Sequence, residues 1–240
     1  MSAPASEQES AYAVPVPMPA PAPRLAPATP SRDMAVGAWP VAKRTLDLLL
    51  ALLGVIAFAP VMLVIAALIK LDTRGPVLFR QRRYGLHQKT FTVLKFRTMS
   101  VDASEDAHRR YIAELAAAGE TGAGLKKLTS DARVTRVGSF LRKSSLDELP
   151  QLFNVLSGRM SLVGPRPAIE YELEHYDFAH YARFDVKPGL TGLWQVSGRS
   201  KLGFNEMLAL DAEYARSTGP LTDAKILART PVEIFRGRCA

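Results

Sequence analysis

An uninterrupted apolar run constrains this chain more than any other feature of its sequence. Residues Leu48 to Ile69 read LLLALLGVIAFAPVMLVIAALI, 22 residues without a charged side chain. As one helix they would measure about 33 Å, close to the ~30 Å hydrocarbon thickness of a bilayer. A buried core helix is the alternative, but core helices rarely run this long without a polar residue. The run therefore predicts a membrane-inserted helix.

Pro60 lies near the middle of the run, where it removes a backbone hydrogen bond and kinks or breaks a helix. Two membrane paths follow: a kinked span with its ends on opposite sides, or a re-entrant hairpin that enters and leaves through one face. Lys43 and Arg44 precede the run. Five basic residues follow it: Lys70, Arg74, Arg80, Arg82 and Arg83. Since basic flanks favour the cytoplasmic side, we expect the re-entrant, proline-broken helix.

The sequence divides into three parts around this helix. Residues 1–40 hold nine of the 17 prolines, many within VPVPMPAPAP, and predict a disordered tail. A motif for a proline-binding domain is the alternative. Residues 41–72 form the expected membrane hairpin, and residues 73–240 form the expected cytoplasmic domain. Because Cys239 is the single cysteine, an intrachain disulfide is excluded, which suits a reducing compartment.

The formal net charge of +8 favours anionic partners, which include nucleic acid, an acidic membrane surface and a phosphorylated substrate. Charge alone does not choose among these partners. Residues 70–97 hold eight Lys or Arg and one acid, Asp72. Each basic side chain near an anionic leaflet contributes about 1 kcal/mol of attraction. Inner-leaflet lipids are therefore an expected partner, although a simple stop-transfer flank has the same composition.

Residues 90–99, TFTVLKFRTM, alternate in a way that predicts a β-strand. Four of them would share one face: Phe91, Val93, Lys95 and Arg97. Two cations on one face suit an anion, while a solvated surface strand is the alternative. Residues 102–119 predict a helix without evident chemistry, on which His108 is expected at the surface because no second ligand stands at metal-binding spacing.

Two adjacent carboxylates, Asp147 and Glu148, stand just ahead of the apolar segment LPQLFNVL. Four residues of that segment recur at helical spacing: Leu149, Leu152, Phe153 and Leu156. Pro150 is tolerated only in a first turn, so the acids are expected at the positive end of this helix. The S-x-x-E pattern from Ser145 to Glu148 also fits a capping box, which would explain the acids without any reaction.

Basic residues on both sides of the acid pair favour chemistry over a cap. Four of them come before it: Arg133, Arg136, Arg142 and Lys143. Arg166 follows it, within Gly-Pro-Arg-Pro. Prolines on both sides restrict the backbone of Arg166 and could aim its guanidinium at a phosphate.

A turn-rich segment, residues 186–200, carries Trp194, Gln195 and Arg199 after two glycine turns. It suits a substrate loop in which Trp194 stacks on a base or sugar, although a buried anchor fits Trp194 equally well.

Residues 204–216 and 221–237 predict two amphipathic helices, the second kinked at Pro231. Five apolar residues of the second suit interfacial contact with lipid or ordinary packing: Leu221, Ile226, Leu227, Ile234 and Phe235.

Taken in order, these segments resemble the bacterial sugar transferases, the monotopic phosphoglycosyl transferases that initiate glycoconjugate assembly. The resemblance runs from about Lys43 to the C-terminus. Five stretches carry it: KRTLDLLLALL, GPVLFRQRRYG, TVLKFRTM, DARVTRVGSFLRKSSLDELPQLFNVLSGRMSLVGPRP and VKPGLTGLWQVSGRS. The sequence looks closest to the short hexose-1-phosphate transferases of exopolysaccharide pathways.

The resemblance implies an enzyme of the bacterial inner (cytoplasmic) membrane with its catalytic domain on the cytoplasmic face. It would move a hexose 1-phosphate, glucose or galactose, from a UDP-sugar to undecaprenyl phosphate and release UMP, with an acetamido sugar as the runner-up. Asp147 and Glu148 match the family's Asp-Glu dyad, which implies Asp147 as the nucleophile of a phosphosugar-enzyme intermediate and as a ligand of an assisting Mg²⁺. Arg166 matches the arginine of the Pro-Arg-Pro element, implicated in substrate binding.

One departure from the family pattern concerns the membrane break. Family members often carry Ser-Pro there, whereas this chain has Ala59-Pro60, so a hydroxyl bond to the freed backbone is absent. The rest of the expected site agrees with elementary chemistry, because a carboxylate that attacks a diphosphate needs cations around the phosphate oxygens. We expect these substrate contacts from seven residues: Lys95, Arg97, Arg133, Arg136, Arg166, Gln195 and Arg199.

We therefore expect an α+β fold, mostly helical with a small β-sheet, a re-entrant membrane helix and amphipathic interfacial helices. Nucleic acid is not expected as a partner, and a homo-oligomer stays open. The rival from another class is a membrane-tethered basic scaffold that binds anions without catalysis. It explains the charge and the apolar run, but it gives no reason for an acid pair beside Pro-Arg-Pro.

Overall fold

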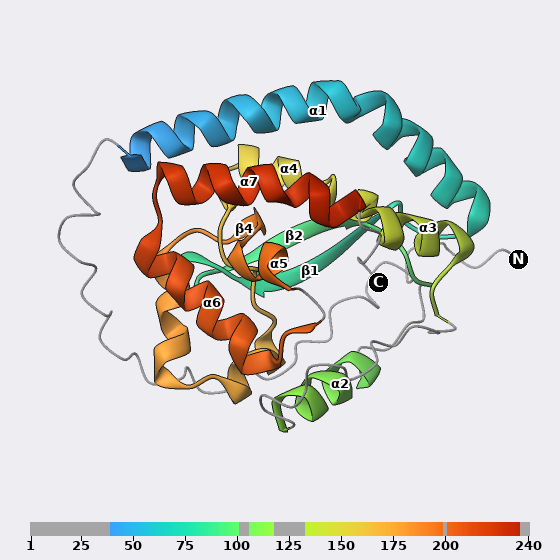
Figure 1. Ribbon diagram of the computed structural model, residues 1–240. Coiled ribbons are helices and arrows are strands. Elements are labelled where there is room, and N and C mark those ends of the chain that lie inside the picture. Colours follow the sequence, from blue (N-terminus) through green and yellow to red (C-terminus); the bar gives the residue numbers. More distant parts are fainter. Residues whose placement is uncertain (1–38, 101–105, 118–132, 199–200, 236–240) are drawn as a thin grey trace, which may run out of the picture.

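The computed structural model describes residues 39–100, 106–117, 133–198 and 201–235. Almost all of the predicted proline-rich tail lies outside these residues. Figure 1 shows one long helix, α1, arching along one side of a domain that contains two small sheets. The predicted class, mostly helical with little sheet, is confirmed, with the strands divided between two two-stranded sheets.

The described elements, with η for a 3-10 helix, follow in chain order: α1 (Trp39–Asp72), β1 (Leu78–Tyr84), η1 (Leu86–Gln88), β2 (Thr90–Phe96), α2 (Asp106–Ala117), α3 (Arg136–Ser144), η3 (Leu146–Glu148), α4 (Gln151–Leu156), β3 (Ser161–Val163), η4 (Glu170–His175), η5 (Phe178–Asp185), β4 (Gly189–Thr191), α5 (Leu193–Ser197), α6 (Phe204–Ser217) and α7 (Pro220–Phe235).

Helix α1 is long and apolar enough to cross a membrane. Its 34 residues correspond to about 51 Å of helix. One narrow face is buried against the domain, whereas large apolar side chains such as Leu53, Ile56 and Leu63 are exposed. An exposed apolar surface of this extent is typical of contact with lipid rather than with water.

Pro60 lies inside α1 and does not end it. The chain continues as helix on both sides of the proline, and Figure 1 shows the whole element as one curved helix. The predicted break into two helices is therefore not confirmed. The re-entrant path stays a prediction.

The first turns of α1 are fastened to the domain by polar side chains. Arg44 donates from Nη1 to the Val155 carbonyl at 2.8 Å. Asp47 accepts from the Leu162 amide at 3.0 Å, and Lys43 donates to the Val163 carbonyl at 3.1 Å and pairs with Asp223. These contacts bind α1 to α4, β3 and α7, so the basic residues ahead of the apolar run are structural tethers.

The last turns of α1 are fastened to the same domain by apolar packing. Ile65 and Ile69 lie in one cluster with Phe96 of β2 and Leu141 of α3. Both ends of α1 therefore contact a single domain, while the middle of the helix leaves its outer face uncovered.

Strands β1 and β2 form an antiparallel hairpin whose register decides which side chains share a face. Arg83 pairs with Phe91, Gln81 with Val93, and Phe79 with Lys95. Directly opposite residues project to the same side of a sheet. Arg83 and Lys95 therefore lie on the face that also carries Phe91 and Val93, which pack on α4.

The short helix α4 exposes a residue that the sequence pattern placed inside. Leu152 and Val155 are buried, whereas Phe153 is 44% exposed. The cause is Asn154, whose side chain donates to the Thr92 carbonyl at 2.7 Å and accepts from the Leu94 amide at 3.0 Å. These bonds turn the Asn154 face toward β2 and turn Phe153 outward, so the predicted apolar face is wrong at Phe153.

The second sheet pairs β3 with β4 in parallel, directly before the Pro-Arg-Pro segment. A Cβ on Gly189 would lie 2.1 Å from the Gly164 nitrogen, and a Cβ on Gly164 would lie 2.3 Å from the Lys187 carbonyl oxygen. Only glycine fits at these two positions, because the two backbones approach this closely. The approach fixes the path of the chain into Arg166.

Helix α7 packs against both β3 and β4, with Ile226 in a buried cluster that includes Val163 and Tyr214. Of the two alternatives for Ile226, lipid contact and ordinary packing, its 2% exposure supports packing. Leu221, at 75% exposure, fits the interfacial prediction, and Pro231 lies inside α7 without ending it.

Candidate active site

The acid pair sits in a short 3-10 turn between two helices. Helix α3 ends as Ser145 takes a left-handed conformation with φ of 56°, and the turn Leu146–Glu148 follows. Leu146 and Leu149, on either side of the acids, pack in the cluster that contains Ile65 and Ile69 of α1. Asp147 and Glu148 are therefore held close to the C-terminal half of the apolar helix.

The alternative reading of the pair as a capping box is not supported by its contacts. Ser145 makes no side-chain cap hydrogen bond. Glu148 instead accepts from Lys95 Nζ at 2.7 Å, which joins β2 to the 3-10 turn. The carboxylate that a capping box would use, that of Glu148, is therefore paired with Lys95, which lies 53 residues away in sequence.

The two neighbouring carboxyls have different proton affinities. Burial raises the pKa of Asp147 to about 6, and the positive charges of Lys95 and Arg142 limit that rise. Burial acts on Glu148 in the same direction, but Lys95, Arg166 and Arg83 outweigh it and hold the pKa of Glu148 below its ordinary value. Paired acids whose pKa values are pushed apart are typical of catalytic sites. At neutral pH Asp147 is a comparatively basic carboxylate, which suits a nucleophile.

Cations from four segments surround the pair. Lys95 comes from β2, Arg83 from β1, Arg142 from α3 and Arg166 from the segment after β3. Arg142 is oriented by donating from Nε to Thr98 Oγ1 at 3.1 Å. This positive field in a partly enclosed site suits an anionic ligand such as a diphosphate.

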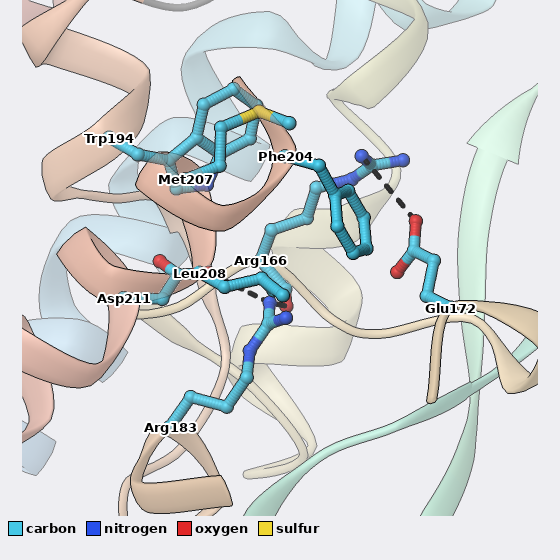
Figure 2. A pocket seen from close by; sticks show the side chains of 8 residues that line it. All are labelled: Arg166, Glu172, Arg183, Trp194, Phe204, Met207, Leu208 and Asp211. Atoms are coloured by element: carbon cyan, nitrogen blue, oxygen red, sulfur yellow. Dashed lines mark hydrogen bonds and ion pairs between the residues drawn. The ribbon is translucent and has the colours of Figure 1, made fainter. Parts of the chain in front are cut away.

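Arg166 lines a pocket that adjoins this cluster. Its side chain is 35% exposed, and its Nη1 lies 3.9 Å from Glu172 Oε1. Figure 2 shows the Arg166 guanidinium beside Glu172 and Phe204, with Trp194 on another wall of the pocket. An exposed guanidinium between an apolar wall and a distant carboxylate is available to bind an added anion.

The structure brings together only part of the predicted site. Lys95 and Arg166 join the acid pair, whereas Arg136 is exposed at the start of α3. Arg133 precedes α3, where its carbonyl accepts from the Ser100 amide, and Gln195 is half-buried on α5. Arg199 lies outside the described residues.

Arg97 is bound to the backbone that follows α1. It donates from Nε to the Pro76 carbonyl at 2.6 Å and from Nη2 to the Thr73 carbonyl at 3.1 Å. Carbonyls after the last turn of a helix lack intrahelical partners, and the buried Arg97 supplies donors for two of them after α1. Arg97 thus has a structural role after α1, and its contact with substrate stays a prediction.

His108 was expected at the surface and is half-buried. Its ring contacts the rings of Tyr111 and Tyr171, and Nδ1 bonds the Tyr171 hydroxyl. Burial, and then the charge of Arg166, lower the pKa of His108 to about 4, so the imidazole is neutral at pH 7. Helix α2 therefore lies close enough to Arg166 for the charge of Arg166 to act on His108.

Arg83 and Arg142 were predicted only as parts of basic segments and not as substrate contacts, and three further charged residues of this region were not predicted at all: Glu172, Arg183 and Asp211. A signal existed for Arg83, because the hairpin register places it on the face of Lys95. No local pattern marks Glu172, Arg183 or Asp211, whose partners are distant in sequence.

A comparison with known families decides what kind of protein carries this site. The family described as "Bacterial sugar transferase" matches residues 38–237, which include α1 and the whole described domain. The chain belongs to the bacterial sugar transferase family. This is a family of enzymes, so the rival prediction of a non-catalytic scaffold is not supported.

Curated relatives agree with this placement of the sugar transferase. The exopolysaccharide production protein ExoY of Sinorhizobium fredii is 43% identical over 190 residues, which cover 79% of this chain and 84% of that protein. The undecaprenyl-phosphate galactose phosphotransferase of Salmonella typhimurium is 40% identical over 196 residues, covering 81% of this chain and 40% of that protein. The UDP-glucose:undecaprenyl-phosphate glucose-1-phosphate transferase of Xanthomonas campestris is 40% identical over 209 residues, which cover 83% of this chain and 40% of that protein.

Proposed function

We propose that this sugar transferase moves hexose 1-phosphate, glucose or galactose, from a UDP-sugar to undecaprenyl phosphate and releases UMP. The observation that carries the proposal is the acid pair, in which a raised pKa at Asp147 and a lowered pKa at Glu148 accompany four surrounding cations. The names of the relatives from Salmonella and Xanthomonas support the sugar and the acceptor.

The proposed reaction has two steps at one carboxylate. An oxygen of Asp147 attacks the β-phosphorus of the donor, and the bond from that phosphorus to the bridging oxygen breaks, so UMP leaves with the electron pair. A phosphate oxygen of the polyprenyl acceptor then attacks the same phosphorus, which releases the Asp147 carboxylate and forms the lipid diphosphate sugar. A covalent intermediate lets a water-soluble donor and a lipid acceptor use the site in turn.

Lys95, Arg142 and Arg166 would neutralise the phosphate oxygens and the leaving nucleotide in the first step. Trp194, a half-buried side chain on the wall of the pocket that Arg166 lines, could stack on a base or sugar ring. The role of Lys95 is twofold, because it also holds Glu148 as a carboxylate.

A magnesium ion fits the acids of this site. Among the described residues, no three His, Cys, Asp or Glu side chains gather as a self-contained metal cluster. Mg²⁺ is usually bound by one or two carboxylates together with substrate phosphates and water, and Asp147, with Glu148 beside it, provides such a donor set. Bound there, the ion would add positive charge against the donor's phosphate oxygens.

The proposed location is the cytoplasmic face of the bacterial inner membrane, with α1 re-entrant. Lys43 and Asp47 at one end of α1, and Ile65 and Ile69 at the other, contact the same domain. A helix that crossed the bilayer would carry one of these ends away from the domain. Both ends are therefore expected on one side, with the uncovered middle in lipid.

Topology labelling tests this path. Single cysteines introduced before Lys43 and after Ile69, in a variant in which Cys239 is replaced by serine, are expected to react with a membrane-impermeant thiol reagent from the cytoplasmic side in inverted vesicles. Labelling of the two positions from opposite sides would contradict the re-entrant path.

The reaction itself is tested with purified full-length protein, a panel of UDP-sugars, undecaprenyl phosphate and Mg²⁺. We expect UMP release with UDP-glucose or UDP-galactose. Release with a UDP-acetamido sugar alone would replace the hexose by the runner-up substrate. The absence of UMP with every donor would contradict the proposed function.

The pH dependence of the first step should report Asp147. Since its pKa is about 6, the carboxylate is the main form at pH 7 and above, and the rate should fall about tenfold per pH unit well below pH 6. Single-turnover UMP release between pH 4.5 and 8.5 measures this limb. A midpoint near 4, the ordinary value for an aspartate, would contradict the raised pKa.

A further inference from the structure

Three successive backbone carbonyls of the Pro-Arg-Pro segment receive hydrogen bonds from three different elements. The Pro165 carbonyl accepts from the Gly189 amide of β4 at 2.8 Å. The Arg166 carbonyl accepts from Arg183 Nη2 of η5 at 2.6 Å, and the Pro167 carbonyl accepts from Arg83 Nη1 of β1 at 2.9 Å. Because the two prolines have no N–H, the segment cannot be held as an ordinary strand, and these donors hold it instead.

The two arginine donors are costly for the fold. Arg83 is 7% exposed and Arg183 is 4% exposed. Taking a guanidinium out of water destabilises the fold unless hydrogen bonds and opposite charge compensate. Arg183 has that compensation from Asp211 Oδ2 at 2.7 Å and from the Tyr176 hydroxyl. Arg83 has the neutral Gln81 Oε1 at 2.9 Å.

The positive charges of Arg83 and Arg166 repel each other. Burial, and then the positive charge of Arg166, lower the pKa of Arg83 to about 10, with the charges of Glu172 and Glu148 acting in the opposite direction. A packed apolar residue at position 83 would avoid both costs. The feature that an apolar residue could not reproduce is the bond to the Pro167 carbonyl.

We propose that Arg83 and Arg183 are positioning residues that hold the Arg166 backbone so that its guanidinium faces the donor's diphosphate. Figure 2 shows Arg183 at the base of the Arg166 side chain, while the Arg166 guanidinium lies at the opposite end, near Glu172. At 3.9 Å that carboxylate forms an ion pair but is beyond hydrogen-bond distance, so within the part of the chain that the structure describes the guanidinium keeps its donors for a ligand. This inference rests on the proposed function for the identity of the ligand.

Positioning through Arg166 predicts a coupling that a purely structural role does not. If Arg83 and Arg183 act through Arg166, their replacement should cost much in the wild type and little once the Arg166 side chain is removed. Residues that only stabilise the fold should cost the same in both backgrounds.

The experiment is a double-mutant cycle on full-length enzyme. Arg83→Met and Arg183→Lys are each made in the wild type and in Arg166→Met, and kcat/KM for the UDP-sugar is measured from UMP release. We expect a loss of about 10- to 100-fold in the wild type and less than about 3-fold in the Arg166→Met background. Arg82→Met, on the exposed face of the same strand, is the matched control and should change neither.

Equal losses in both backgrounds would overturn the proposal. If a variant shows no cooperative unfolding transition, kcat/KM is measured for Arg83→Lys instead, which keeps the charge and a donor. Its loss of kcat/KM is again expected only in the wild-type background. The same double-mutant cycle is also measured with the affinity for UDP, determined by calorimetry, which does not depend on turnover. A wild type that neither binds UDP nor releases UMP would contradict the proposed function, whereas an active wild type with additive losses would contradict only the positioning.

Discussion

Replacing Asp147 with asparagine is expected to reduce UMP release by at least about 10³-fold, because the amide oxygen carries no charge with which to attack phosphorus. Trapping of radiolabelled sugar phosphate on the protein should fall below detection in the same variant. Both are measured on full-length protein in detergent or lipid discs, with the UDP-sugar that the wild type prefers.

The stability of this variant separates loss of chemistry from loss of fold. Burial raises the pKa of Asp147 above that of the unfolded chain, so the charged carboxyl disfavours the folded state at pH 7. Asp147→Asn removes that charge, and its unfolding temperature should equal or exceed that of the wild type. A drop in activity accompanied by a drop in unfolding temperature would instead indicate structural damage.

Asp177→Asn provides the matched control, since Asp177 is exposed just before η5 and donates its backbone amide to His180 Nδ1, a bond that the substitution keeps. Its activity should stay within about twofold of the wild type. Label trapped on Asp147→Asn at the wild-type level would show that another group is the nucleophile, and the assignment of Asp147 would be wrong.

The elements nearest the chemistry were predictable because short-range patterns determine them. The uncharged run of α1, the alternation of residues 90–99 and the proline-locked Arg166 each follow from the conformational limits of a few neighbouring residues. The acid pair was found in the same way, although spacing alone could not separate a dyad from a capping box. The bond from Lys95 to Glu148 separates them.

What the sequence could not supply is pairing between distant segments. Lys95 and Arg97 are equivalent in a strand pattern, yet Lys95 meets Glu148 while Arg97 turns back to the carbonyls after α1. The difference arises because the end of α1 lies beside the end of β2, which no local window contains. The pairing of Arg183 with Asp211, 28 residues apart, is invisible for the same reason.

Pro60 in α1 shows the reverse case, in which tertiary contacts override a conformational preference of a single residue. Proline inside a helix costs about 3 kcal/mol or more. Helix α1 nevertheless continues through Pro60, with contacts to the domain on both sides of it. Tertiary packing of the flanking turns can offset a local cost of that size, so a proline predicts a bend more securely than it predicts a break.

Lys95→Met is expected to lower kcat/KM at pH 7 by about 10²-fold and to move the acid limb of the pH profile to higher pH. Lys95 is the strongest of the charges that lower the pKa of Asp147 and of Glu148. Without it, burial acts on both carboxyls with less opposition, and each binds its proton at a higher pH. At pH 7 Asp147 would then be largely protonated and unable to attack.

The pH profile distinguishes this role of Lys95 from direct contact with substrate. If Lys95 acts through the acids, Lys95→Met should recover much of its activity at pH 9, and Lys95→Arg should keep a wild-type acid limb. Lys89→Met, a like substitution at an exposed residue just before β2, should leave the profile unchanged. A loss that is constant from pH 6 to pH 9 would contradict control of the acids. It would leave Lys95 as a phosphate contact, because a missing positive charge at the donor is missed equally at every pH at which Asp147 is ionised.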